Sequence, residues 1–252
     1  MLLEIHTLTY PMPNSSSPLY CSLARDPAEV LEAQALRYKV FVEEMGAQLS
    51  DAEQLDRDGY DPFCDHLLVR DRESDRIVGA YRILSPEMAR EAGGYYSAQE
   101  FDLSRLEPLF DHMVEVGRAC VHPDYRNGST ISLLWTGLAR YMLQNRYEYL
   151  IGCASIDMTD GGHLAASIYN KVKAEHLSPP EYRVFPRAPL PLDKLRSDID
   201  APLPALLKGY LRVGAYVCGE PTWDPVFNTA DLLVMQPVSR MSRRYADHFY
   251  RP

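Results

Sequence analysis

The sequence has few of the features that stabilise secreted domains or anchor proteins in membranes. Its five cysteines are an odd number and include no Cys-x-x-Cys pair, which suits neither a disulfide framework nor a zinc site. The N-terminal segment has no basic start and no long apolar run, so we expect no signal peptide. No stretch approaches the roughly 18 apolar residues of a membrane span. We therefore expect a cytoplasmic protein with no metal site, and these absences leave peripheral contact with the inner membrane open.

Basic residues are scarce relative to acidic ones. The 252 residues include 26 Lys and Arg against 35 Asp and Glu, which gives a formal net charge of −9. A general nucleic-acid-binding protein presents a basic surface, so we expect no nucleic-acid partner. The whole excess lies in residues 1–100, which hold 9 basic and 18 acidic residues. The hydrophobic fraction of 46% is that of an ordinary globular protein.

Periodicity and turn signals predict a mixed α/β domain. Asp26 and Pro27 are typical of a helix start. Residues 1–18 are expected to be an exposed lead-in and residues 19–252 a single domain, with a loop at 46–65 and a proline-rich connector at 179–204. Because paired strands alternate with helices, we expect a largely antiparallel sheet flanked by helices. The expected strands are 19–24, 66–70, 77–84, 113–121, 147–156, 210–217 and 230–235, and the expected helices are 27–45, 131–142 and 163–173.

The pair Glu115 and Arg118 lies in the expected central strand. Residues three apart in a strand point to opposite faces unless a bulge intervenes. Glu115 has the chemistry of a general base toward an amine, and Arg118 that of a carboxylate clamp. A purely structural ion pair is the alternative for these two residues.

The turn that follows this strand leads into a helix. Arg126, Asn127 and Gly128 precede Ser129 and Thr130, whose backbone amides lie at the helix start. Unpaired amides and the helix dipole attract phosphate at such a position. The alternative is an ordinary capped turn in which glycine relieves backbone strain.

Two further positions carry candidate functional groups. Arg37 and Phe41 lie one helical turn apart, so they share one face, and an arginine on that side needs an acid or an anionic ligand. The acids nearest in sequence are Asp58 and Asp61, and a helix-to-loop salt bridge is the alternative to a binding role. Tyr169 could donate a proton to a leaving thiolate, although packing against the sheet is the commoner role for such a tyrosine.

These residues resemble those of a known group of enzymes. The strand, turn and helix with Arg-Asn-Gly, followed by AASIYNKV, resemble the GNAT acyltransferase fold. The spaced residues Arg37, Phe41, Asp58, Asp61, Arg82, Glu115 and Arg118 are similar to those of acyl-homoserine-lactone synthases. Three later segments resemble the L-ornithine Nα-acyltransferases of ornithine-lipid biosynthesis: EVGRACVHPDYRNGSTISLLW, GCASI and LLKGYLRVGAYVCGEPTWDPVFNTADLLVM.

The resemblance implies a GNAT-type fold with a mixed, mostly antiparallel sheet. It implies transfer of a 3-hydroxyacyl group from acyl carrier protein to the α-amine of ornithine, with no cofactor beyond the donor's 4′-phosphopantetheine. Glu115, Arg118 and Tyr169 would be catalytic, and Arg37, Phe41, Asp58, Asp61 and Arg82 would bind the substrate. The phosphopantetheine would lie against residues 126–130. The alternatives are an N-acyl amino acid synthase with another acceptor and an acyl-homoserine-lactone synthase.

Overall fold

The computed structural model describes residues 17–49 and 51–241. The chain forms two compact units, and each is described by itself. Unit 1 contains residues up to Ile83 together with Arg118–Asn145, and unit 2 contains Leu84–Gly117 and the chain from Arg146 onward. The expected lead-in lies almost wholly outside the described residues. The expectation of a single domain over 19–252 stays a prediction.

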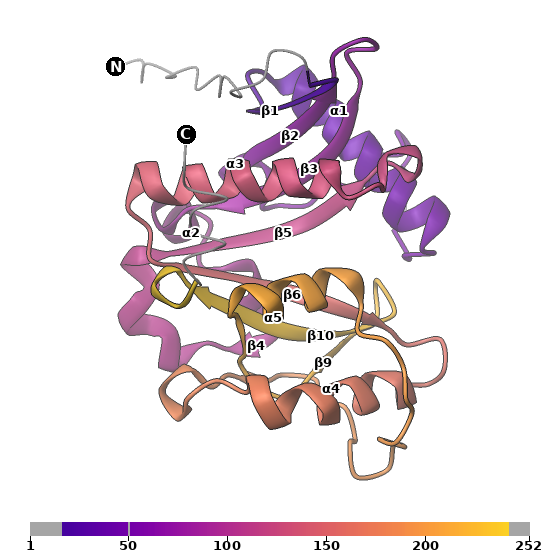
Figure 1. Cartoon of the computed structure of the whole chain (residues 1–252), viewed down its shortest axis with the longest axis vertical. Helices are drawn as coiled ribbons and strands as arrows, with labels where there is room; N and C mark the ends of the chain where they lie inside the picture. The colour runs from indigo at the N-terminus through magenta and orange to yellow at the C-terminus, as the bar shows by residue number, and fades with distance from the viewer. Residues whose placement is uncertain (1–16, 50, 242–252) are drawn as a thin grey trace. The chain divides into compact units, whose positions relative to one another are not determined.

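Unit 1 is built on antiparallel strands with a helix on each face (Figure 1). Strand β2 pairs with β1 and with β3, and β3 lies beside the second half of β5. Leu68 packs with the core residues of α1, while Leu67 contacts α3 at Gly137. Neighbouring residues of a strand face opposite sides of the sheet, so α1 and α3 cover opposite faces. The elements are β1 (Leu19–Leu23), α1 (Pro27–Tyr38), η1 (Lys39–Glu44), η2 (Asp61–Phe63), β2 (Asp65–Asp71), β3 (Ile77–Leu84), β5 (Met113–Val121), η5 (Pro123–Tyr125) and α3 (Ser129–Asn145).

The start of α1 confirms the predicted cap. The Asp26 carboxylate accepts hydrogen bonds from the N–H groups of Ala28 and Glu29, and Pro27 occupies the first helical position. The predicted helix of 27–45 is regular only to Tyr38, after which η1 continues as a π-helix. Arg37 lies before this change and Phe41 after it, and the shared face that we predicted for them stays a prediction. Phe41 is partly buried against the α1 core.

Unit 2 is built on the first half of β5, followed by β6, β10 and β8. Strand β5 pairs with β6 in parallel, and β10 pairs antiparallel with β6, β8 and β9. The parallel pairing ends at Glu115 and Ile151, although β6 continues to Asp157. The elements are α2 (Pro86–Glu91), η3 (Tyr96–Gln99), β4 (Phe101–Asp102), η4 (Ser104–His112), β6 (Tyr149–Asp157), α4 (His163–His176), η6 (Pro180–Tyr182), β7 (Phe185–Pro186), α5 (Ala205–Val213), β8 (Tyr216–Val217), β9 (Thr222–Asp224), β10 (Thr229–Pro237) and η7 (Val238–Arg240).

The two faces of the unit 2 sheet differ in character. Ala154 and Ile156 of β6 join Leu232 and Val234 of β10 in a core covered by α4 and α5. The alternate residues of the same strands, including Cys153, point to the other face. Figure 1 shows α5 and α4 alongside β10 and β9. The predicted mixed, mostly antiparallel sheet is therefore confirmed.

One predicted strand is wrong. Residues 205–213 form α5, and only Tyr216–Val217 of the predicted strand 210–217 are extended. Leu207 and Leu211 are both buried, and their spacing of four is that of one helix face. Gly214 then ends the helix with a φ of 102°, a conformation that glycine adopts without strain. The short strand β9 was not predicted.

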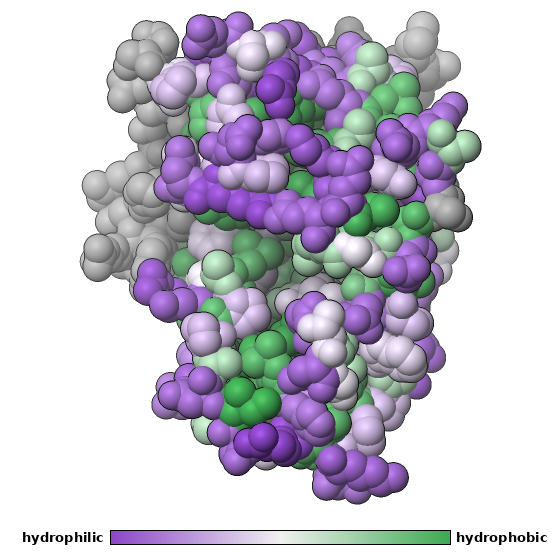
Figure 2. Space-filling view, turned by 90° about the vertical axis from the view of Figure 1, so that its right-hand side faces the viewer, coloured by the Kyte–Doolittle hydropathy of each residue, from purple (hydrophilic) through white to green (hydrophobic). Residues whose placement is uncertain are grey.

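The surface is mostly polar. In Figure 2 hydrophilic side chains cover much of the visible face, and hydrophobic ones form smaller groups between them. Among the residues that the structure describes, no helix combines the length and apolar character needed to cross a membrane. Peripheral membrane contact stays a prediction. The exposed large hydrophobic side chains of the described residues are Leu31, Met45, Met88, Leu143, Phe185, Trp223 and Val226.

Candidate active site

Glu115 is held in place by a short segment that precedes it in the chain. Its carboxylate is buried, with 4% of the residue exposed. The Tyr96 N–H donates to Oε2 over 2.5 Å, the Ser97 N–H donates to Oε1 over 2.8 Å, and the Ser97 hydroxyl also donates to Oε1. Tyr96 and Ser97 are the first two residues of η3, so the N-terminus of a 3₁₀ helix orients the carboxylate. Such charge-assisted hydrogen bonds are short and strong.

The Ser97 hydroxyl connects Glu115 to a second carboxyl group. Ser97 Oγ lies 3.6 Å from Cys153 Sγ, and the Cys153 thiol donates to Glu100 Oε2 over 3.6 Å. Burial, with the charges of Asp231 and Asp224, raises the pKa of Glu100 to about 8. Burial also raises the pKa of the Cys153 thiol, with help from the charge of Glu100. Both groups therefore hold protons near neutral pH.

Glu100, Cys153 and Asp231 also have the chemistry of a cation site. Their ligand atoms all lie within 4.8 Å of one another. Carboxylate oxygen and thiolate sulfur both bind divalent zinc. We predicted no metal site from the sequence, and that expectation stays a prediction.

Unit 1 contains a network of ion pairs between three arginines and three aspartates. Arg37 is 1% exposed and donates to Asp56 over 2.9 Å and to Asp61 over 2.8 Å. Arg82 donates to Asp58 over 2.7 Å and lies 3.6 Å from Asp61. The predicted salt bridge from helix to loop is therefore present. The charges of this network cancel, so none of its buried charges lacks an opposite partner.

The two arginines that lie near Asp61 lower the pKa of its carboxyl. Burial alone would raise the pKa of the Asp61 carboxyl, but hydrogen bonds and charges from Arg37 and Arg82 hold it below its usual value. Burial and the charge of Arg37 lower the pKa of His66, which lies 3.8 Å from Asp61. Asp61 is therefore ionised and His66 neutral at neutral pH. The predicted contacts of Arg37, Asp58, Asp61 and Arg82 with substrate stay predictions.

Arg118 joins the same network through an unusual backbone conformation. Its φ is 53°, in the left-handed region that non-glycine residues rarely adopt. The side chain lies 3.3 Å from Asp56 and 3.3 Å from Asp58. Glu115 and Arg118 thus share strand β5, but the distorted backbone at Arg118 changes the direction of its side chain, as a β-bulge would. Strained backbone of this kind is commonly found at functional sites.

The predicted phosphate loop lies at the start of α3. Gly128 has a φ of 88°, and the Asn127 side chain accepts from the Ser129 N–H over 3.1 Å. Thr130 is buried, and its hydroxyl donates to the Tyr125 carbonyl over 3.1 Å. Arg126 forms an exposed, two-pronged ion pair with Glu44. The loop is therefore a capped helix start with an arginine beside it, and its phosphate-binding role stays a prediction.

Tyr169 lies in the apolar core of unit 2. It is 6% exposed and packs with Ala154 and Ile156 of β6. Glu115 pairs with Ile151, so its side chain is on the opposite face of the sheet from Tyr169. Burial raises the pKa of the Tyr169 hydroxyl, with a smaller contribution from the charge of Glu220. The packing role that we considered for this tyrosine is present, and its role as an acid stays a prediction.

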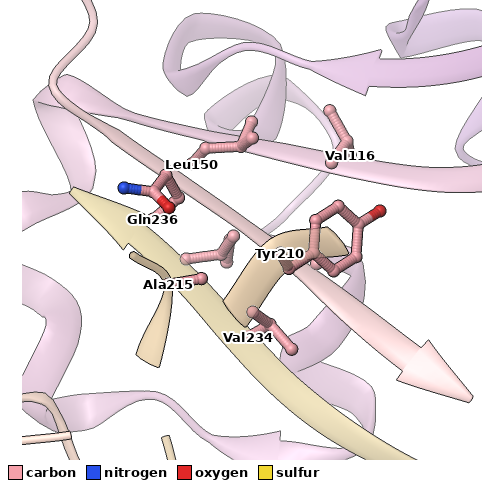
Figure 3. A pocket seen from close by; sticks show the side chains of 8 residues that line it. Val116, Leu150, Tyr210, Ala215, Val234 and Gln236 are labelled. Carbon is pink, nitrogen blue, oxygen red and sulfur yellow. The ribbon is translucent and has the colours of Figure 1, made fainter. Parts of the chain in front are cut away.

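A pocket opens on the face of unit 2 that α5 covers (Figure 3). The space in it that a water molecule can occupy is about 20 Å³, which is room for about one water. A Cβ on Gly152 would lie 2.5 Å from the Val116 carbonyl oxygen, so a side chain there would push the strands apart. The lining of the pocket is mainly apolar. It is lined by Val116, Leu150, Ile151, Gly152, Tyr210, Ala215, Val234 and Gln236.

The chain is similar to curated enzymes over most of its length. It is 38% identical over 245 residues to the L-ornithine Nα-acyltransferase of Rhodobacter capsulatus, covering 91% of this chain and 93% of that protein. It is 39% identical over 246 residues to that of Agrobacterium fabrum, covering 90% and 83%. The chain belongs to the L-ornithine Nα-acyltransferase family. It is therefore an N-acyltransferase, and the resemblance stated above is confirmed.

The wider classification agrees with the membership of this family. Residues 36–136 match the acetyltransferase (GNAT) domain family, a range that contains Glu115 and Arg118. The structure resembles that of the acyl-homoserine-lactone synthase LasI, with a TM-score of 0.53 and 16% identity over 92% of this chain and 94% of LasI. At that identity the likeness concerns the fold alone, and it confirms the predicted GNAT-type fold.

Sequence reasoning missed several residues of these sites. Asp56 contacts Arg37, yet we named only Asp58 and Asp61 as its acidic neighbours. Ser97 and Glu100 lie in the segment 86–111, which contains none of the strands and helices that we listed from the sequence, and no pattern there points to Glu115. Asp231 gave a usable signal, because it is a buried acid within the apolar strand β10.

Proposed function

We propose that this N-acyltransferase moves a fatty acyl group from the thioester of acyl carrier protein to the α-amine of L-ornithine. The observation that carries the proposal is the 38% identity, over 91% of the chain, to a protein named L-ornithine Nα-acyltransferase. The carrier protein as donor rests on the resemblance described in the sequence analysis.

In the proposed reaction the amine nitrogen attacks the thioester carbonyl carbon. Glu115 takes the proton from the amine, directly or through one water, because only the neutral amine is a nucleophile. The carbonyl oxygen becomes an oxyanion, which needs an N–H donor aimed at it. The pairing of β5 with β6 ends at Glu115, so the main chain at 116–121 is the proposed source of that donor.

The C–S bond then breaks and leaves the amide product and a thiolate. Tyr169 gives its proton to the thiolate in this proposal. Glu115 and Tyr169 are on opposite faces of the unit 2 sheet, as their strand register and packing require. The amine would therefore approach from one face while the thiol leaves on the other.

Charged groups of unit 1 complete the proposal. Residues 126–130 would bind the phosphate of the phosphopantetheine, with Arg126 exchanging its Glu44 partner for the phosphate. The exchange costs little, because exposed ion pairs contribute about 0–1 kcal/mol. Arg82 and Arg118 would hold the carboxylate of the amino acid. Asp58 is the most exposed acid of the network, at 25% of its side chain, and would be the acid that receives a cationic side chain.

A product assay tests the proposal. The purified protein is incubated with a 3-hydroxyacyl carrier protein and L-ornithine, and the product is identified by mass spectrometry. We expect acyl-ornithine with the acyl group on the α-nitrogen. Each of the other amino acids, supplied in parallel, tests the alternative of another acceptor. Absence of acyl-ornithine with an active donor, or methylthioadenosine released from S-adenosylmethionine, would contradict the proposal.

A further inference from the structure

Glu115 is a buried group that must lose a proton in every turnover of the proposed reaction. It takes that proton from the amine, and 4% of the residue is exposed. Its carboxylate accepts from the Tyr96 N–H, the Ser97 N–H and the Ser97 hydroxyl. A backbone N–H only donates, whereas a hydroxyl both donates and accepts. Of these three donors, the Ser97 hydroxyl is therefore the one that can carry a proton away from Glu115.

The Ser97 hydroxyl begins a series of hydrogen-bonding groups in unit 2. Ser97 is 0% exposed, and its Oγ lies 3.6 Å from Cys153 Sγ, where either atom can be the donor. The Cys153 thiol donates to Glu100 Oε2, also over 3.6 Å. Hydroxyl and thiol groups each donate one proton and accept another, the thiol more weakly. The side chains of Ser97 and Cys153 therefore connect the carboxyl groups of Glu115 and Glu100.

The sheet and one short helix bring this series together. Glu115 pairs with Ile151 of β6, and residues two apart in a strand point to the same face, so Cys153 shares the face of Glu115. Ser97 is the second residue of η3, and Glu100 directly follows that helix. Side chains three apart in a 3₁₀-helix are aligned, so Ser97 and Glu100 both reach Cys153.

Glu100 differs from Glu115 in its exposure and in its neighbours. It is partly exposed, whereas Glu115 is buried. Burial and the charge of Asp231 of β10, with that of Asp224 of β9, raise the pKa of Glu100 to about 8. The hydrogen bond from Cys153 of β6 opposes this rise in pKa, and the charge of Glu115 of β5 adds to it. The series therefore ends at a carboxyl group that binds a proton firmly and has access to water.

We propose that Ser97, Cys153 and Glu100 form a relay that carries away the proton which Glu115 takes from the amine. The inference rests on the proposed function, because it starts from Glu115 as the base. Protonated Glu115 gives its proton to Ser97 Oγ as the hydroxyl proton of Ser97 passes to Cys153 Sγ. The thiol proton of Cys153 then passes to Glu100 Oε2, and Glu100 releases it to water. Each transfer breaks one bond to hydrogen and forms one, so nothing is oxidised and Glu115 is again a carboxylate.

The relay acts on the rate and not on substrate binding. Ser97, Cys153 and Glu100 act through Glu115, so they are positioning residues for the proton, and their loss should lower kcat with little change in KM. Glu100 must be a carboxylate to accept the proton. With a pKa of about 8 it is mostly protonated at neutral pH. The contribution of the relay to kcat should therefore grow as pH rises through about 8.

Kinetics of Cys153 variants test the relay, because they leave the three donors to Glu115 in place. Cys153→Ala interrupts the relay and should lower kcat about tenfold, a fraction of what general base catalysis contributes, with KM unchanged. Cys153→Ser keeps a hydroxyl and should restore most of kcat. Cys218→Ala is the matched control, because it removes another buried thiol of unit 2 and should keep the wild-type kcat. A wild-type kcat in Cys153→Ala, or equal losses in Cys153→Ala and Cys153→Ser, would overturn the inference.

Glu100→Gln tests the last member of the relay, and it serves as the second variant where Cys153→Ala does not fold. Glutamine has nearly the shape of glutamate, but its amide does not take up a proton in this pH range. The ratio of wild-type kcat to Glu100→Gln kcat should therefore grow as pH rises through about 8. Taking the ratio removes the pH dependence that both proteins share through the amine substrate. A ratio that stays constant with pH would contradict the relay.

An infrared measurement separates this inference from the proposed function. The carbonyl stretch of the protonated Glu100 carboxyl is the signal that Glu100→Gln lacks. Cys153→Ala removes the thiol donor and should change the frequency of that signal, and an unchanged frequency would overturn the inference. A changed frequency in a protein that forms no acyl-ornithine supports the inference for another amine and contradicts the proposed function. Acyl-ornithine formed by Cys153→Ala with the wild-type kcat supports the proposed function and contradicts the inference.

Discussion

The acids around Arg37 in unit 1 and the acids around Ser97 in unit 2 have different partners. In unit 1, Asp56, Asp58 and Asp61 each lie within salt-bridge distance of an arginine. In unit 2, Glu115 accepts from two backbone N–H groups and a hydroxyl, and Glu100 accepts from a thiol. No salt bridge between described residues includes Glu100. The partners of the first group are cations, and those of the second are uncharged donors.

The titration of the two groups differs accordingly. Despite its burial, the pKa of Asp61 is lowered by Arg37 and Arg82, while burial and neighbouring acids raise the pKa of Glu100 to about 8. Both acids are largely buried, so burial alone does not decide the direction. The sign of the neighbouring charge does. Glu100 therefore keeps its proton to a higher pH than Asp61 does.

The largest expected effect is on catalysis, from Glu115→Gln. Removing the proposed base should lower kcat by about 10²–10⁴-fold, measured as acyl-ornithine formed under saturating substrates. Glutamine also places a donor near the Tyr96 or Ser97 N–H groups, so the comparison is made where both proteins are folded. The exposed Glu107→Gln is the matched control and should keep full activity. Full activity of Glu115→Gln across the pH range would show that Glu115 is not the general base.

The next effect is on stability, from Arg37→Met. The change leaves Asp56 and Asp61 buried with part of their pairing lost, which should cost about 3–5 kcal/mol. Denaturant unfolding measures this free energy. Arg57 is the matched control, because it is 44% exposed and pairs with Asp51 and Glu53; Arg57→Met should cost less than about 1 kcal/mol. Equal losses of unfolding free energy in the two variants would show that the buried network stabilises the fold no more than an exposed ion pair does.

Unfolding free energies measured over a pH series test the opposite directions of the Glu100 and Asp61 pKa shifts. The folded-state pKa of Glu100 is raised to about 8 from a reference of 4.5, so its contribution to stability is present below 4.5 and is lost as pH rises through about 8. Glu100→Gln should remove that part of the pH dependence. The pKa of Asp61 is lowered from 3.8, so its contribution is present above 3.8 and is lost at lower pH. Parallel curves for wild type and Glu100→Gln between pH 4.5 and 8 would contradict the raised pKa.

The smallest stability effect is expected at the phosphate loop. Arg126→Gln breaks an exposed ion pair with Glu44, so it should change the unfolding free energy by less than about 1 kcal/mol. The KM for the acyl donor should nevertheless rise about tenfold, since a charged hydrogen bond to phosphate is lost. Glu44→Gln breaks the same ion pair but leaves Arg126 available, so its KM should not rise. The same rise in KM in both variants would show that Arg126 does not bind the phosphate.

The sequence predicted most elements but failed where two patterns competed. Strands 113–121 and 77–84 were found at their observed bounds, because each is a mainly apolar segment with turn signals at its ends. The segment 210–217 failed because Leu207 and Leu211 belong to a helix face that begins before it. The helix at 27–45 was found, but its change to a π-helix at Lys39 has no signal in the periodicity.

The sequence by itself determined the chemical groups, the local elements that carry them and the resemblance to a family. It placed Glu115 on a strand and Arg126 before a helix, because both depend on short-range patterns. The tertiary structure alone decided their partners. Asp56 reaches Arg37 across 19 residues, and Ser97 reaches Glu115 across 18. Contacts between distant segments follow from packing, which local periodicity does not encode.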